Sequence, residues 1–168
     1  MSATIADRAP ASIHATALVF REAGILIRGP SGSGKSSLAL ALLALAKDRN
    51  CFAALVGDDR VILEARSGRL TARCAARVEG LIERRGIGIV RAAGPTVALI
   101  RLVVDLLPQG ERMPRIACPE AKPVEIAGIA LPQMILGGPA SSTERAYAVI
   151  EELDRTSHNH LSTIANFA

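Results

Sequence analysis

The sequence predicts a single domain of the α/β class. Short runs of valine, isoleucine and leucine that suit strands alternate with two stretches that suit helices, at 35–50 and from Ser141 onward. The 168 residues are 49% apolar, which is enough for one buried core and excludes a disordered chain. We expect one domain over 1–168, with 1–12 and 156–168 weakly ordered because they lack a clear pattern.

The first half of the chain contains a predicted hairpin, a helix and a strand. Residues 18–20 and 24–27 are apolar runs separated by a short polar turn, which is typical of a hairpin. The run 35–50 favours helix and has leucines on several sides, so this helix is expected to be buried against a sheet. A strand is expected at 52–56.

The second half contains the strand that we expect to be central. Residues 61–63 and 70–74 form a second predicted hairpin. Residues 96–107 are apolar on both alternating faces, as in a strand covered on both sides. Residues 108–139 carry six prolines and predict loops and short edge strands. The last helix is expected to begin at Ser141, whose hydroxyl can cap it, and to end near Leu153.

Composition narrows the classes of partner and compartment. The net charge is +4, but only 2% of residues are aromatic, so stacking platforms for single-stranded nucleic acid are missing and small anions such as phosphates are favoured. Charged residues interrupt every apolar run before the ~18 to 20 residues of a membrane span. No signal peptide is visible, and the three widely spaced cysteines suit a reducing compartment. We therefore expect a soluble, cytoplasmic protein without nucleic-acid or membrane partners.

Residues 29–36, GPSGSGKS, match the pattern G-x-x-x-x-G-K-[ST] between an expected strand and an expected helix. Such a loop cradles phosphates with backbone N–H groups, while its lysine reaches the outer phosphates and its hydroxyl binds magnesium. A plain glycine-rich turn that caps a helix is the alternative. The residues expected to bind the nucleotide are Gly29, Pro30, Ser31, Gly32, Ser33, Gly34, Lys35, Ser36 and Ser37.

Three further groups could supply chemistry. Asp58 and Asp59 follow a strand, and paired acids can divide metal binding and proton acceptance, although a solvated turn is the alternative. Glu83 and Arg85 share one face if this segment is extended, but a salt-bridged loop explains them as well. His14 on its own suits a packed or solvated histidine.

These four features, in this order, resemble the HPr kinase/phosphorylases, bacterial enzymes that act on a serine of the phosphocarrier protein HPr. The resemblance rests on His14, the phosphate loop 29–36, the string LVGDDRV at 55–61 and the string ERRGIG at 83–88, and it covers about 13–107. It implies a P-loop fold similar to phosphoenolpyruvate carboxykinase, with a mixed sheet and flanking helices. It also implies ATP and Mg²⁺ as cofactors, HPr as partner and a homo-oligomer such as a hexamer.

The resemblance also implies a role for each site residue. Asp58 would be the base that activates the serine, and its acid form would assist phosphorolysis of phosphoserine to pyrophosphate. His14 would lie beside Asp58 and tune it. Ser36, Asp59 and Glu83 would bind magnesium. The remaining residues with catalytic roles would be Lys35 and Arg85 at the phosphates and Arg112 in a loop that meets HPr.

The sequence departs from the family pattern in three places. Few residues precede His14, so we expect a short form with the catalytic domain only, of the alphaproteobacterial type. Pro30 stands where many members carry aspartate, and a later family element has no clear match in 136–143. Kinase activity is therefore better supported than phosphorylase activity. The alternatives are a small-molecule P-loop kinase and a non-catalytic nucleotide-binding module.

Overall fold

The computed structural model describes residues 8–75, 81–84, 88–91, 95–108, 110–111 and 123–165. Side chains are described for 10–75, 95–108, 110–111 and 123–156. These ranges include the phosphate loop, the aspartate pair and the first part of the last helix.

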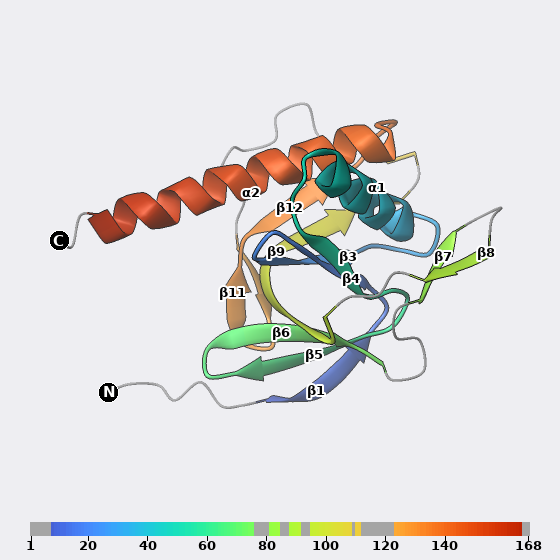
Figure 1. Ribbon diagram of the computed structural model, residues 1–168. Helices are drawn as coiled ribbons and strands as arrows, with labels where there is room; N and C mark the ends of the chain where they lie inside the picture. Colours follow the sequence, from blue (N-terminus) through green and yellow to red (C-terminus); the bar gives the residue numbers. More distant parts are fainter. Residues whose placement is uncertain are drawn as a thin grey trace.

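A mixed eight-stranded sheet forms the centre of the molecule, and it curls so that one end turns away from the helices (Figure 1). The strand order is β1-β5-β6-β9-β3-β2-β4, and β12 also pairs with β9. The strands are β1 (Arg8–Ile13), β2 (Thr16–Phe20), β3 (Ala23–Arg28), β4 (Ala53–Gly57), β5 (Val61–Arg66), β6 (Arg69–Cys74), β9 (Val97–Leu106) and β12 (Gln133–Leu136). Two hairpins lie outside it: β7 (Leu81–Arg84) with β8 (Gly88–Arg91), and β10 (Val124–Ile126) with β11 (Ile129–Leu131).

Strand β9 links the two parts of this sheet because three strands pair with its ten residues. Along one edge it runs parallel to β3. Along the other edge its first residues pair antiparallel with β6, and its last residues pair parallel with β12. The parallel ends of β3, β9 and β12 therefore lie together, directly before the phosphate loop.

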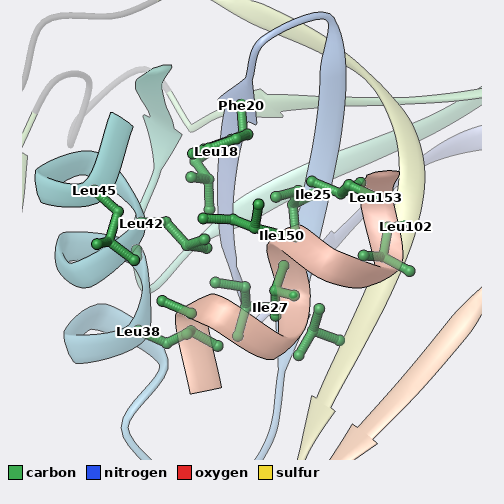
Figure 2. Packing of buried hydrophobic residues seen from close by; sticks show 14 of the residues in the cluster. Leu18, Phe20, Ile25, Ile27, Leu38, Leu42, Leu45, Leu102, Ile150 and Leu153 are labelled. Atoms are coloured by element: carbon green, nitrogen blue, oxygen red, sulfur yellow. The ribbon is translucent and has the colours of Figure 1, made fainter. Parts of the chain in front are cut away.

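Helices α1 (Lys35–Asp48) and α2 (Ser142–Ala165) cover one face of the sheet and pack against each other (Figure 1). Figure 2 shows their apolar side chains meeting those of the sheet in one core. Alternate residues of β3 supply opposite faces, since Ile25 and Ile27 belong to this core whereas Leu26 belongs to the core on the other face. Burial on both faces explains why β3 and β9 have nearly continuous apolar sequences.

The second core fills the other side of the sheet. It combines side chains from β5, β6 and β9 with Ile129 and Leu131 of the β10–β11 hairpin. The sheet is therefore enclosed by helices on one side and by its own curled end and this hairpin on the other.

The predicted α/β class, both predicted hairpins, the first helix and the central position of β9 are confirmed. The last helix is longer than predicted, because it continues past Leu153 to Ala165. No glycine or proline lies between Ser141 and Ala165, so nothing in the local sequence stops it. Within the described ranges, no helix is long and apolar enough to cross a membrane.

Candidate active site

The phosphate loop connects β3 to α1, as predicted. Gly29 opens it with φ 149°, and a Cβ there would lie 2.6 Å from the carbonyl oxygen of Leu106 and 2.7 Å from Ser33 Oγ. A side chain would therefore push the loop away from the end of β9 and distort the turn. This position requires glycine for both its conformation and its close contacts.

The first turn of α1 is left open toward the loop. The N-cap is Gly34, with φ 98°, and within the described residues no side chain caps this end and the first turn carries no acid. The first N–H groups of the helix thus lack intrahelical partners, and the helix dipole adds partial positive charge there. Such an end binds phosphate oxygens well.

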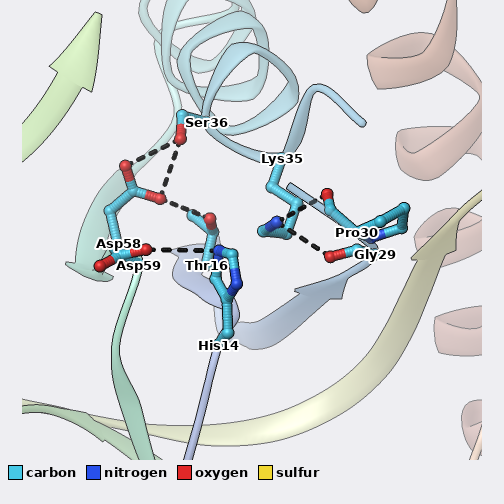
Figure 3. Close-up of polar contacts among 8 residues, drawn as sticks. All are labelled: His14, Thr16, Gly29, Pro30, Lys35, Ser36, Asp58 and Asp59. Carbon is cyan, nitrogen blue, oxygen red and sulfur yellow. Dashed lines mark hydrogen bonds and ion pairs between the residues drawn. The ribbon is translucent and has the colours of Figure 1, made fainter. Parts of the chain in front are cut away.

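Lys35 is folded back onto the loop. Its Nζ donates hydrogen bonds to the carbonyl oxygens of Gly29, at 2.9 Å, and of Pro30, at 3.1 Å (Figure 3). Burial lowers the pKa of Lys35, and the negative charges of Asp58 and Asp59 only partly oppose this. Among the described residues no carboxylate forms a direct ion pair with this ammonium, and a phosphate that entered the loop would supply that partner.

Asp58 is the buried carboxylate of the site, with 6% of the residue exposed. It follows β4 and accepts a hydrogen bond from Thr16 Oγ1 at 2.5 Å. Ser36 Oγ donates to the same carboxylate, at 2.8 Å from Oδ2 and 3.0 Å from Oδ1. The structure thereby brings β2, β4 and the first turn of α1 together at one carboxylate (Figure 3).

Asp59 turns the other way, into solvent. Its φ of 67° lies in the left-handed region, so consecutive aspartates point to different surroundings. The Asp59 side chain is 82% exposed, and its Oδ1 lies 3.3 Å from His14 Nε2. His14 and Asp59 line a pocket of about 220 Å³. Ser12, Ile13 and Arg60 supply the rest of its lining.

Two details of the predicted arrangement differ in the structure. His14 was expected beside Asp58, but it pairs with Asp59. Ser36 was expected to share a metal with Asp59, whereas its hydroxyl contacts Asp58. Both differences follow from the turn at Asp59, which directs one carboxylate inward to the loop and the next outward to the histidine.

The other predicted residues are less completely placed. Glu83 lies in β7, whose backbone contacts α1, but its side chain is outside the described set. Arg85 and Arg112 lie outside the described residues. Their proposed roles remain predictions.

A polar network supports the loop from behind. Arg28, the last residue of β3, donates from Nε and Nη2 to the two carboxylate oxygens of Asp105, each at 2.7 Å. Gln133 Nε2 donates to Asp105 Oδ2 at 2.6 Å. Burial raises the pKa of Asp105, but hydrogen bonds from Arg28 and Gln133 and the charge of Arg28 outweigh it, so the pKa lies below its usual value. The network ties together the parallel ends of β3, β9 and β12.

The sequence interpretation missed Thr16 and Arg145. Thr16 begins β2 and is fully buried, and a lone hydroxyl at the start of an apolar strand was the only signal for it. Arg145, on α2, donates from Nη1 to the carbonyl oxygen of Ser33 at 3.3 Å. Nothing in the local sequence links that arginine to a loop more than a hundred residues earlier.

The donor atoms present fit a magnesium ion. Mg²⁺ prefers carboxylate and hydroxyl oxygens, and phosphate loops hold it with their Ser/Thr hydroxyl and an aspartate on a neighbouring strand. Ser36 Oγ and the carboxylate of Asp58 are already neighbours here. In the described part of the chain, no three His, Cys, Asp or Glu side chains form a separate metal cluster.

The phosphate loop, whose serine Ser36 donates a hydrogen bond to the buried carboxylate of Asp58, places the chain in the class of P-loop nucleotide-binding proteins. The profile of the family described as HPr Serine kinase C-terminal domain matches residues 6–152, and the chain belongs to that family. The predicted family resemblance is confirmed.

Individual relatives agree with this assignment. The chain is 38% identical over 106 residues to the HPr kinase/phosphorylase of Mycoplasma mycoides and 33% identical over 107 residues to that of Mycoplasma genitalium. These matches cover 59% and 60% of this chain but 32% of each relative, so the chain matches about a third of their length. The solved structure of the Hpr(Ser) kinase/phosphatase from Coxiella burnetii superimposes with a TM-score of 0.67 at 28% identity, covering 90% of this chain and 99% of that one.

Proposed function

We propose that this protein is a cytoplasmic, ATP-dependent kinase that phosphorylates a serine of the phosphocarrier protein HPr. The observation that supports this most is the contact between the buried Asp58 and Ser36 of the phosphate loop. This contact supports a role for Asp58 beside the phosphates of a bound nucleotide, within reach of an incoming hydroxyl. The names of the relatives supply the identity of the acceptor.

The loop supplies binding and charge. Its N–H groups and the open end of α1 hold the phosphates of ATP, and Lys35 moves from the loop carbonyls to the outer phosphates. Asp58 accepts the proton of the serine hydroxyl. The serine oxygen then forms a bond to the γ-phosphorus, the bond from that phosphorus to the β–γ bridging oxygen breaks, and ADP leaves.

Magnesium would be held by Ser36 together with a carboxylate of the aspartate pair, with Glu83 as a further candidate. When bound, the ion neutralises charge on the phosphates. Both Asp58 and Asp59 are candidates for its carboxylate ligand, because Ser36 contacts Asp58 whereas the resemblance assigns the metal to Asp59. We assign the base to Asp58 and the metal to Asp59, and the kinetics of two variants test that division.

The test compares Asp58→Asn and Asp59→Asn in HPr phosphorylation at increasing magnesium concentration. Loss of a base lowers kcat by about 10²- to 10⁴-fold and is not restored by magnesium. Loss of a metal ligand raises the magnesium concentration needed for half-maximal rate. Asp154→Asn, on α2 and paired with Arg21, serves as the control and should be unchanged.

Two results would contradict the proposal. Near-normal kcat in Asp58→Asn, with a raised magnesium requirement, would exchange the roles of the two aspartates. Phosphate transfer to a metabolite and none to HPr would favour a small-molecule kinase instead.

We also propose that the reverse phosphorolysis, which releases pyrophosphate, uses the same site, and that the protein acts as a homo-oligomer of hexameric type. The residue proposed for the HPr-facing loop is Arg112, and the residue proposed for the phosphates is Arg85. Loss of HPr phosphoserine on addition of inorganic phosphate tests the first statement. Sedimentation equilibrium of the purified protein tests the second.

A further inference from the structure

Arg145 links α2 to the phosphate loop although it lies outside every motif. Its Nη1 donates to the carbonyl oxygen of Ser33 at 3.3 Å, and its Nη2 donates to the carbonyl oxygen of Gly138 at 2.8 Å. One guanidinium therefore joins the loop to the segment between β12 and α2. Among the described residues of α2, no other side chain donates a hydrogen bond to the backbone of the phosphate loop.

The contact fixes the direction of one peptide group. In a trans peptide the C=O and the following N–H point in opposite directions, and the described residues contain no cis peptide. When Arg145 holds the carbonyl of Ser33 toward α2, the N–H of Gly34 points away from α2. A phosphate-binding loop works by directing successive N–H groups toward the anion.

Two buried polar atoms beside this contact lack partners. Ser33 Oγ and Arg145 Nε form no hydrogen bond with any described residue. Ser33 is 7% exposed, and its Oγ lies against Gly29 at the base of the loop. An unpartnered buried polar group is costly and calls for an explanation, and a ligand that supplies the missing partner is one.

We propose that Arg145 is a positioning residue for nucleotide binding. It holds the Ser33–Gly34 peptide so that the N–H of Gly34 is directed at the phosphates, and Ser33 Oγ, which has no partner among the described residues, is a further donor for the same anion. This rests on the proposed function only in assuming that the loop binds a nucleotide. The ligand class that it serves is the polyphosphate.

The experiment measures binding of ATP with Mg²⁺, and of pyrophosphate, by calorimetry to wild type, Arg145→Met and Arg145→Lys. Arg145→Met removes a hydrogen bond from a charged donor. We therefore expect its affinity for both ligands to fall by about 10- to 100-fold. Arg145→Lys keeps the charge and one donor, so it should recover part of the loss. Arg155→Met is the matched control, since Arg155 lies on the same helix, is exposed and pairs only with nearby Glu152 in the described contacts.

Two further readouts separate positioning from general damage. In HPr phosphorylation, KM for ATP should rise while KM for HPr stays unchanged, and urea unfolding of the same variants reports how much of each is folded. If Arg145→Met proves too unstable to assay, the ATP affinity of Arg145→Lys is compared with that of Arg155→Met, and a weaker affinity in Arg145→Lys alone supports the positioning role. Equal ATP affinity in the Arg145 variants and wild type would overturn the role of Arg145 alone, whereas absence of ATP binding in wild type would overturn both it and the proposed function.

Discussion

Thr16→Val tests whether the buried hydroxyl of Thr16 holds Asp58 in its working position. Valine has nearly the same shape, so the fully buried site keeps its packing and loses only the hydrogen bond of 2.5 Å to Asp58 Oδ1. A hydrogen bond to a charged acceptor contributes about 1.5–3 kcal/mol, which corresponds to about 10- to 150-fold in rate if all of it serves to position the carboxylate. We expect kcat for HPr phosphorylation to fall within that range.

The assay follows HPr phosphoserine formation at saturating ATP and magnesium, with urea unfolding measured on the same preparations. The free energy of unfolding should fall by about 1–3 kcal/mol, because Asp58 stays buried with one donor fewer. Thr16→Ser keeps the hydroxyl and is the control that should retain most of kcat. An unchanged kcat in Thr16→Val, or an equal loss in both variants, would refute the positioning role.

Two further predictions concern the scaffold behind the loop. In Gly24→Ala, the new Cβ would lie 2.3 Å from the carbonyl oxygen of Leu99, so β3 and β9 must separate, and urea unfolding should show a loss of about 1–3 kcal/mol. Gly128→Ala, which faces open space at φ 82°, shows the cost of backbone strain without that clash, and an equal loss in both would contradict the prediction. Asp105→Asn should cost about 1–3 kcal/mol near pH 7 by weakening the pairing with Arg28. Because the pKa of Asp105 is lowered by folding, the wild-type contribution is complete above the ordinary value of 3.8 and declines as pH falls from there to the lowered pKa, so the two proteins should converge in acid. A difference in unfolding free energy that stayed constant from pH 7 into this acid range would rule out the carboxylate as its source.

The parts of the site that one segment encodes were predictable from the sequence. The loop 29–36 is a local pattern between a strand and a helix, and the pair Asp58–Asp59 directly follows a strand. Both were located correctly. Which of the two aspartates faces the loop depends on the backbone turn at Asp59, where φ is 67°. Aspartate tolerates this left-handed conformation but does not require it, so the sequence alone does not determine the turn.

The parts that depend on distant segments were not predictable. Thr16 and Asp58 are 42 positions apart, and Arg145 and Ser33 are 112 apart. Each contact exists because sheet order and helix packing place their elements side by side, and no local periodicity encodes that placement. The same limit applies to His14, which directly follows β1 and contacts Asp59 only because of the path of the chain between β4 and β5.

The position of β9 also affects how the chain can assemble during synthesis. Strand β3 pairs with β9, and β6 pairs with β9, but β9 is made about seventy residues after β3. Until β9 leaves the ribosome, both earlier strands expose an unpaired edge, and such edges favour association with other chains. A nascent chain stalled before residue 97 should therefore bind chaperones or aggregate, and one that has emerged through β12 can close the sheet.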